Sequence, residues 1–518
     1  MKKSFVRRAV ALSMIGVMML SGAATGCGKK KVDYNIDDEN GGSENGGSGD
    51  SGELRAKVKA PESYTGDIPV GNSGLSSIKI NAEKIEIPNA STMSVVYCEP
   101  LSYDSDYKKT LAESFFDKSK GIYKYDYEKP IREDVQKELD VYQAMLDDAN
   151  AAGDTENAQW IGDTVNSLKS DLAKATDERE PVGDTYDSDS YIGYIGDQLY
   201  ELDMYGDSSG VNGSASIAPY PYITIKDIRP HDDCYNVSYY GDDYNSYDLE
   251  NQSDMTKDEA VSYATSYLAD LGFKDAMLKS CSPLIWDYYD YAGNTLAEEC
   301  DGWSITFVKS VDNVPIYSPD VWNLDYLDTN NVWYTTSDQT INLSIYNGSA
   351  FQVNINYSLN TIKEDSDVEL LSWDEILKSA QEKIPEFYKD NKTSYLDLEF
   401  DKVKLTYFRV KDEDTTGQYK LIPVWAFIST SYGDEEGDTS TEEDTEEDTE
   451  DSAFEDSYPT QLILINAMDG SLIDVASQLE GESNDSDDVT SSTISDDGSF
   501  AVEKEVDEGD IQKKGIIE

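Results

Sequence analysis

Two capping boxes, at residues 256–259 and 372–375, open two amphipathic segments in the second half of the chain. In each box a Thr or Ser is followed three residues later by Glu, so each side chain can accept a hydrogen bond from the other residue's backbone N–H. Apolar residues then recur at helical spacing, up to Gly272 in the first segment and Phe387 in the second. Both segments are predicted to be helices.

Runs of alternating polarity follow both helices and are typical of strands. They lie at residues 284–291, 303–308, 332–336, 341–346 and 351–357 after the first helix, and at 395–400, 403–410, 421–431, 461–466 and 471–475 after the second. Asn347-Gly348 is a typical tight hairpin turn. We therefore predict an α+β fold in which two units, 251–365 and 366–480, each pack a helix against an antiparallel meander.

The clearest periodicity in the chain lies at residues 130–176. Pro130 suits the first position of a helix, and apolar residues recur every three or four positions on both sides of Gly153. This pattern predicts two antiparallel helices, which either pack on the rest of the protein or offer a surface to a partner. The helical hairpin would be inserted in an N-terminal α+β region spanning residues 82–250.

The first 26 residues are predicted to be a secretory signal. Basic residues precede an apolar run at residues 9–20, which is shorter than the roughly 20 residues that cross a bilayer. The sequence Ala24-Thr25-Gly26-Cys27 resembles the lipobox of bacterial lipoproteins, in which the cysteine is lipidated. The resemblance implies a lipid anchor on Cys27 at the extracellular face of the cell membrane; secretion without a lipid is the alternative.

Three polar segments are predicted to lack a packed core. Residues 27–81 are rich in Gly, Ser and charged residues, and they are predicted to be a flexible tether after the lipidated Cys27. The acidic stretch at 433–457 is an insertion between two predicted strands of the second unit, and residues 481–518 are an acidic tail. Both acidic segments are interpreted as solvated, with weak Ca²⁺ or basic-protein binding as the alternative.

The charge of the chain limits its partners. It has 104 acidic and 42 basic residues, which give a formal net charge of −62. Phosphate backbones depend on Lys and Arg for attraction, so nucleic acid is excluded as a natural partner. A basic protein surface is instead favoured.

Four cysteines follow Cys27, and an exported protein could pair them in three ways. They are Cys98, Cys234, Cys281 and Cys300. Cys281 with Cys300 is the preferred pair, because the residues between them could fold as a hairpin and bring its ends together. Four buried thiols are the alternative.

Several kinds of chemistry lack their residues or motifs. His231 is the one histidine in the chain, which excludes zinc sites that need two, and it is interpreted as structural or solvated. The sequence contains neither nucleotide-binding glycine motifs nor a complete EF-hand loop. We expect no catalytic residues, metal or cofactor, with a carboxylate-based hydrolase as an alternative. The aromatic stretches 286–291 and 322–333 pack a core or, alternatively, bind sugar rings.

The segments LIPVWAFI and LILINAMDGSLIDV, at residues 421–428 and 462–475, carry a family resemblance. With the preceding helix and strands, from residue 256, they resemble PepSY-like modules and the exported YycH and YycI regulators of a cell-wall histidine kinase. They also resemble uncharacterised surface lipoproteins of gut Clostridia. The resemblance implies a non-catalytic module that binds or restrains a protein partner at the cell envelope. A glycan-binding or solute-binding lipoprotein is the alternative.

Overall fold

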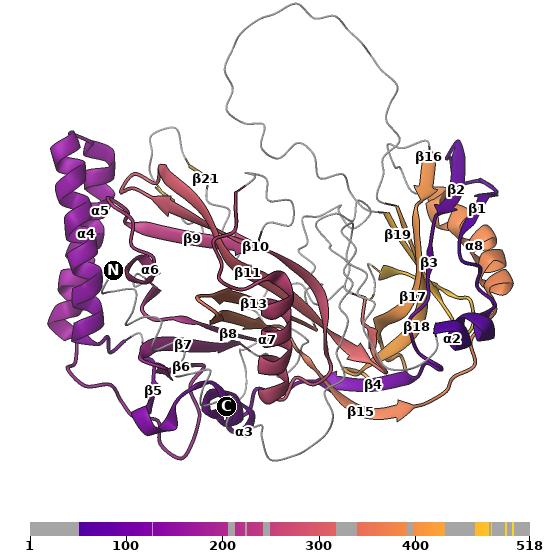
Figure 1. Cartoon of the computed structure of the whole chain (residues 1–518), viewed down its shortest axis with the longest axis horizontal. Coiled ribbons are helices and arrows are strands. Elements are labelled where there is room, and N and C mark those ends of the chain that lie inside the picture. The colour runs from indigo at the N-terminus through magenta and orange to yellow at the C-terminus, as the bar shows by residue number, and fades with distance from the viewer. Residues whose placement is uncertain are drawn as a thin grey trace, which may run out of the picture.

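The chain folds into two lobes, one of which is inserted in the other (Figure 1). The structure, a computed structural model, describes residues 51–126, 128–205, 213–222, 225–241, 249–317, 339–390, 397–429, 461–475, 478, 493–494 and 500–501. Of these described residues, those between 51 and 100 and between 359 and 475 form the terminal lobe, and those between 103 and 357 form the inserted lobe. Helices and strands occur in both lobes, so the predicted α+β class is confirmed.

The inserted lobe is built on a ten-stranded sheet whose pairings are antiparallel. Its strands follow the order β5-β6-β7-β8-β14-β13-β11-β10-β9, and β12 pairs with β11. Their bounds are β5 (Ile122–Lys124), β6 (Ser190–Ile195), β7 (Gln198–Tyr205), β8 (Ser214–Pro219), β9 (Asn236–Gly241), β10 (Ala276–Tyr289), β11 (Thr295–Val311), β12 (Val314–Pro315), β13 (Thr340–Tyr346) and β14 (Ser349–Ile355).

One face of this sheet carries the core of the inserted lobe. Helices α3 (Ser105–Phe115) and α7 (Lys257–Asp270) pack their apolar residues there, including Leu111 and Leu268. The first capping box lies at the start of α7, where Thr256 N donates to Glu259 Oε2 at 2.9 Å. Asp104 caps α3 in a similar way, accepting from the backbone of Asp106 and Tyr107. Local sequence signals therefore place both helices correctly.

The terminal lobe contains a seven-stranded and a three-stranded sheet. The first is made of β3 (Ile85–Glu86), β4 (Val95–Pro100), β15 (Leu359–Asp365), β17 (Lys402–Lys411), β18 (Tyr419–Ser429), β19 (Gln461–Asn466) and β20 (Leu472–Ile473). The second is made of β1 (Tyr64–Ile68), β2 (Ser77–Ala82) and β16 (Asp397–Phe400). Helices α2 (Ser51–Val58) and α8 (Trp373–Phe387) contribute Leu54, Trp373 and Ile376 to their shared core.

The segment that runs from the end of β11 through β12 to Ile316 leaves the inserted lobe and enters the core of the terminal lobe. Val308, Val314 and Ile316 are buried with the core residues of that lobe. Ile316 forms a parallel bridge with Tyr407 of β17, and Tyr317 N donates to the Tyr407 carbonyl at 2.7 Å. The two lobes thus share apolar packing as well as backbone hydrogen bonds.

The lobes are also joined where the chain crosses between them. Leu101 N donates to the carbonyl of Ser358 at 2.7 Å, so the entry and exit of the inserted lobe lie side by side. Ser94 Oγ is within 2.9 Å of Asp312 Oδ2 and 2.8 Å of Glu364 Oε1. This hydroxyl therefore lies between carboxylates from both lobes.

The predicted division into an N-terminal region and two successive units is wrong. β8, from the predicted region 82–250, pairs with β14, from the predicted unit 251–365, in one sheet. β4 likewise pairs with β15 and β18, although the residues of the inserted lobe separate it from both in the sequence. The sequence signals for helices and strands are local. The pairings described here join strands far apart in the sequence, and a capping box does not specify which strands will pair.

The predicted tether is too long at its C-terminal end. Residues 51–81 contain α2, β1 and most of β2, and they bury Leu54, Val58, Ile78 and Ile80. The short run SIKINA alternates in the way that a half-buried strand requires, but the polar composition around it outweighed this signal in our prediction. The rest of the predicted tether, residues 27–50, lies outside the described residues. In the predicted tail, β21 (Thr493–Ile494) pairs with β22 (Phe500–Ala501).

Replacing Ile316 with Ala should lower the free energy of unfolding by about 2–5 kcal/mol, because a side chain that is 5% exposed would leave a cavity in the shared core. Chemical denaturation followed by tryptophan fluorescence measures this change. Ile362→Ala is the matched control, since Ile362 is 47% exposed, and it should change the value by less than about 0.5 kcal/mol. Equal effects of the two substitutions would contradict the coupling of the lobes.

Candidate functional site

The most prominent surface feature is a pair of helices at the far end of the inserted lobe, α4 (Arg132–Ala152) and α5 (Thr155–Lys174) (Figure 1). Between them lies Gly153 with φ +74°, a left-handed conformation that favours glycine. The facing sides of the helices bury a separate apolar cluster: Leu139, Met145, Ala149, Ile161 and Val165. This cluster comes from the three-and-four spacing that is visible in the sequence. Pro130, however, lies two residues before the first helical residue.

The two helices are fixed to the lobe near their base. Arg179 Nη2 donates to Asp134 Oδ1 at 2.7 Å, and the two side chains are only 12% and 4% exposed. A buried ion pair of this kind is strongly destabilising when one partner is removed. Farther along α4, Tyr235 Oη donates to Asp148 Oδ2 at 2.6 Å. These contacts use one side of the pair and leave its outer side exposed.

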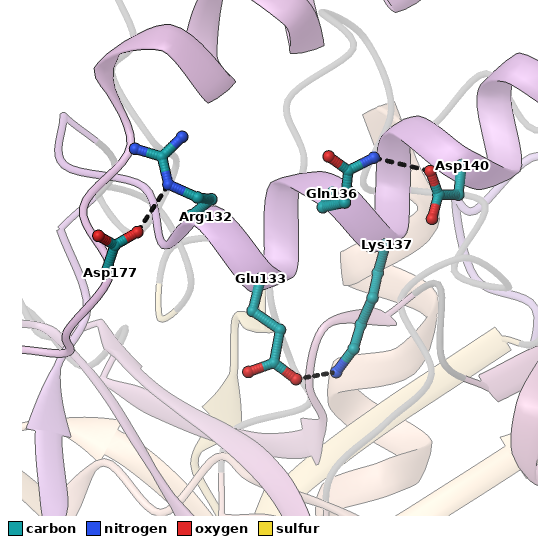
Figure 2. A pocket seen from close by; sticks show the side chains of 6 residues that line it. All are labelled: Arg132, Glu133, Gln136, Lys137, Asp140 and Asp177. Carbon is teal, nitrogen blue, oxygen red and sulfur yellow. Dashed lines mark hydrogen bonds and ion pairs between the residues drawn. The ribbon is translucent and has the colours of Figure 1, made fainter.

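The outer side of α4 carries a shallow cavity of about 420 Å³ (Figure 2). Six polar residues line it, and Figure 2 shows them joined in pairs: Arg132 with Asp177, Glu133 with Lys137, and Gln136 with Asp140, at 2.6, 3.2 and 2.7 Å. Four of the charged groups have a neighbour of opposite sign, and Asp140 accepts a hydrogen bond from the neutral amide of Gln136. The arrangement offers a mixed-charge helix surface for recognition rather than a set of unsatisfied groups for catalysis.

Trp160 is the large apolar side chain that the helix pair exposes. It lies in the second turn of α5, near the end of the helix pair, and it is 44% exposed. Its indole Nε1 donates to Asn157 Oδ1 at 2.7 Å, which orients the ring on the helix surface. An exposed, oriented tryptophan is a frequent anchor in protein interfaces.

A second, smaller cavity of about 120 Å³ lies where the helix pair meets the sheet. Lys124, Lys129, Arg179 and Glu180 are among its lining residues. Lys129 is within 3.2 Å of Asp126, so its charge is balanced locally. The volume suits a few water molecules and is smaller than the cavities that usually hold small-molecule ligands.

A second buried charge in the inserted lobe, besides Asp134, is the guanidinium of Arg229, just after helix α6 (Ile225–Ile228). Arg229 is 8% exposed. Its guanidinium lies 4.9 Å from the Trp286 ring and 5.0 Å from the Tyr346 ring, distances typical of cation–π contacts. It donates to Asp301 Oδ2 at 2.5 Å and also bonds to Glu299.

This cluster corrects one interpretation of the aromatic stretch 286–291. Trp286 and Tyr288 are 0% and 2% exposed, so neither ring is available to a sugar. Tyr288 Oη instead accepts a hydrogen bond from Arg229 Nε at 2.5 Å, and His231 lies beside the Tyr288 ring with centroids 4.9 Å apart. The other aromatic stretch, 322–333, lies outside the described residues. A lone arginine in a loop gives no periodic signal, which is why sequence reasoning missed Arg229.

The preferred disulfide between Cys281 and Cys300 is also wrong. The strands β10 and β11 do pair, but Cys281 faces Ile305 while Cys300 faces Ile285. Four residues along a strand span about 13 Å, and a disulfide needs Cα atoms closer than about 7 Å. Both residues are thiols in the structure, as are Cys98 and Cys234. Burial raises the pKa of Cys98 to about 11.

Other predicted features fall partly outside the described residues. Cys27, the acidic insertion 433–457 and most of the acidic tail are among them. Within the described residues, no group of three His, Cys, Asp or Glu side chains could hold a metal ion. None of the helices described is both long and apolar enough to cross a bilayer.

Replacing Arg229 with Lys should lower the free energy of unfolding by about 2–4 kcal/mol, because an ammonium cannot reach Asp301, Glu299 and Tyr288 together. Denaturant titration measures the loss. Lys378→Arg is the control, since that side chain is 75% exposed, and it should change the value by no more than about 0.5 kcal/mol. If the Arg229 variant were as stable as the wild type, that result would contradict the stabilising role of the buried Arg229 guanidinium.

No protein-family model and no curated protein matches the chain. A solved structure of an uncharacterized protein from Eubacterium rectale is similar to it, with a TM-score of 0.39 and 11% sequence identity. The alignment covers 82% of this chain and 99% of that one. A likeness this distant carries no argument about function, so the function is argued from the residues themselves.

Proposed function

We propose that this is a lipid-anchored, extracellular, non-enzymatic protein that binds a protein partner through the outer side of α4 and α5. The observation that carries the proposal is the exposed Trp160 on a helix pair that the lobe contacts along one side only. A rigid helix surface with an aromatic anchor and balanced polar neighbours has the composition of a protein interface.

The charge of the helix pair indicates the kind of partner. α4 carries six acidic and two basic residues, and α5 carries three acidic and two basic residues. The whole chain has a net charge of −62, so a basic protein surface would be attracted at long range. We therefore propose a partner with a basic patch and an apolar pocket for Trp160.

The lipid anchor rests on the leader and on the resemblance of residues 24–27 to a lipobox. The PepSY-like and regulator-like segments that follow, at residues 421–428 and 462–475, support a role in binding rather than catalysis. Near the buried arginine, Asp301 and Glu299 hold the guanidinium of Arg229, so this carboxylate pair is engaged in the fold. A hydrolase built on that pair is therefore disfavoured.

Replacing Cys27 with Ala should abolish lipid attachment, because a methyl side chain offers no thiol to acylate. Wild-type cells grown with radiolabelled palmitate should incorporate the label into the protein, whereas cells with Cys27→Ala should not. The variant should also leave the membrane fraction, since the acyl chains contribute about 0.8 kcal/mol per buried methylene. Cys234→Ala is the control and should retain the label. Label in the Cys27 variant would refute the anchor.

Replacing Trp160 with Ala should weaken partner binding by about 2 kcal/mol, which is roughly 30-fold, if Trp160 is the anchor. Detergent-solubilised full-length protein would be used to recover its partner from envelope extracts, and the affinity for that purified partner would then be measured by calorimetry. Gln159→Ala, an exposed neighbour on the same helix, is the control and should bind like the wild type. Undiminished affinity of the Trp160 variant would exclude this surface.

A further inference from the structure

One face of the ten-stranded sheet is polar over most of its width. One residue from each of seven strands is paired with a residue on the next strand, and together they form a row across the sheet: Ser190, Asp203, Ser216, Asn354, Asn342, Thr306 and Ser280. A neighbouring row two residues farther along the strands contains Ile192, Glu201, Ala218, Gln352, Ser344, Ser304 and Ser282. We call these two rows the polar face.

The opposite side of the same strands makes the polar face a rigid platform. Residues that alternate with the polar ones, such as Leu202, Ile217, Leu343 and Phe307, are buried in the core beneath α3 and α7. Side-chain positions on the polar face are therefore fixed by strands that cannot slip without exposing this core.

Hydrogen bonds between neighbouring strands orient the two asparagines. Ser216 Oγ donates to Asn354 Oδ1 at 2.7 Å, and Thr306 Oγ1 donates to Asn342 Oδ1 at 2.8 Å. Because each amide oxygen is used in this way, the adjoining NH₂ group is the part left to donate to a ligand. Two amide donors thus lie on adjacent strands, about 5 Å apart.

The polar face is nearly neutral in a chain that is 28% charged. Neither row contains Lys or Arg, and Glu201 and Asp203 are their acidic members. Burial, with the nearby charge of Asp203, raises the pKa of Glu201 to about 8, so this carboxyl is largely protonated at neutral pH. The solvated side of a sheet usually carries long charged side chains. Short neutral hydrogen-bonding groups are instead suited to a neutral, hydroxyl-rich ligand.

An exposed aromatic ring stands at the edge of the polar face. Tyr205 lies two residues beyond Asp203 on β7, so its side chain points to the same side of the sheet. It is 61% exposed, more than the other exposed large hydrophobic side chains of the described residues. The flat face of a tyrosine can pack against the apolar face of a sugar ring.

We propose that the polar face, together with Tyr205, is a binding site for a neutral polysaccharide chain. A chain is favoured over a free monosaccharide because the rows extend across seven strands, and the larger cavity lies elsewhere, against α4. An anionic polymer is disfavoured by the absence of Lys and Arg from the two rows and by the net charge of −62. This site is separate from the proposed partner surface on α4 and α5.

Affinity electrophoresis of detergent-solubilised full-length protein tests the proposal. Native gels would contain one of several neutral polysaccharides, namely soluble starch, dextran, hydroxyethyl cellulose, galactomannan or xyloglucan, or the anionic polygalacturonate. At least one neutral polymer should retard the protein, and polygalacturonate should not. Free glucose at millimolar concentration should not reverse the retardation. Retardation by none of the neutral polymers, or equally by polygalacturonate, would overturn the proposal.

Variants locate the site. Asn342→Ala with Asn354→Ala should raise the dissociation constant about tenfold or more through loss of the amide donors. Tyr205→Ala, which changes an exposed side chain and leaves the core intact, should weaken binding several-fold. Circular dichroism and the thermal midpoint check that each variant folds. Trp160→Ala should bind polysaccharide like the wild type, so failure of the partner proposal is distinguishable from failure of this one. Wild-type binding by both the double variant and Tyr205→Ala would exclude the polar face.

Discussion

The fold depends on pairings between strands that lie far apart in the sequence. β4 pairs with β15 and β18, which follow the whole inserted lobe in the sequence. The segment after β11 also places Val314 and Ile316 in the core of the terminal lobe. Burying these side chains in a shared core ties the two lobes together more firmly than a peptide linker would. Both the partner surface and the polar face therefore belong to one connected framework.

Local features of the sequence predict local features of the structure. The capping box at Thr256 and Glu259 begins α7 where it is expected, and the spacing of apolar residues on both sides of Gly153 locates α4 and α5. Long-range pairing is a different matter, because the alternation of a strand does not name its neighbour. The assignment of residues 82–250 and 251–365 to separate bodies failed for this reason, as the pairing of β8 with β14 shows.

The same distinction applies to the candidate sites. Cys281 and Cys300 lie on the two strands of a hairpin as expected. The strand register decides whether two side chains meet, and here it pairs Cys300 with Ile285, four positions along β10 from Cys281. Arg229 has no motif, and its importance follows from rings and carboxylates that other strands bring to it. Each of seven strands contributes only two residues to the two rows of the polar face. The face can therefore be recognised only once the order and register of the strands are known. Spacing does not single out Trp160 either, because its neighbour Ile161 takes the buried side of α5.

The nesting of one lobe within the other also sets the order in which the fold can be completed as the chain is made from its N-terminus. Ser94 meets Glu364, 270 residues later, so the first strands of the terminal lobe emerge long before their neighbours exist. The inserted lobe, whose two ends touch at Leu101 and Ser358, can close on itself in the meantime. Segments such as β2 and β4 must wait for their later partners with unsatisfied backbone edges, a state prone to aggregation. A chain built in this way is expected to depend on chaperones while it folds.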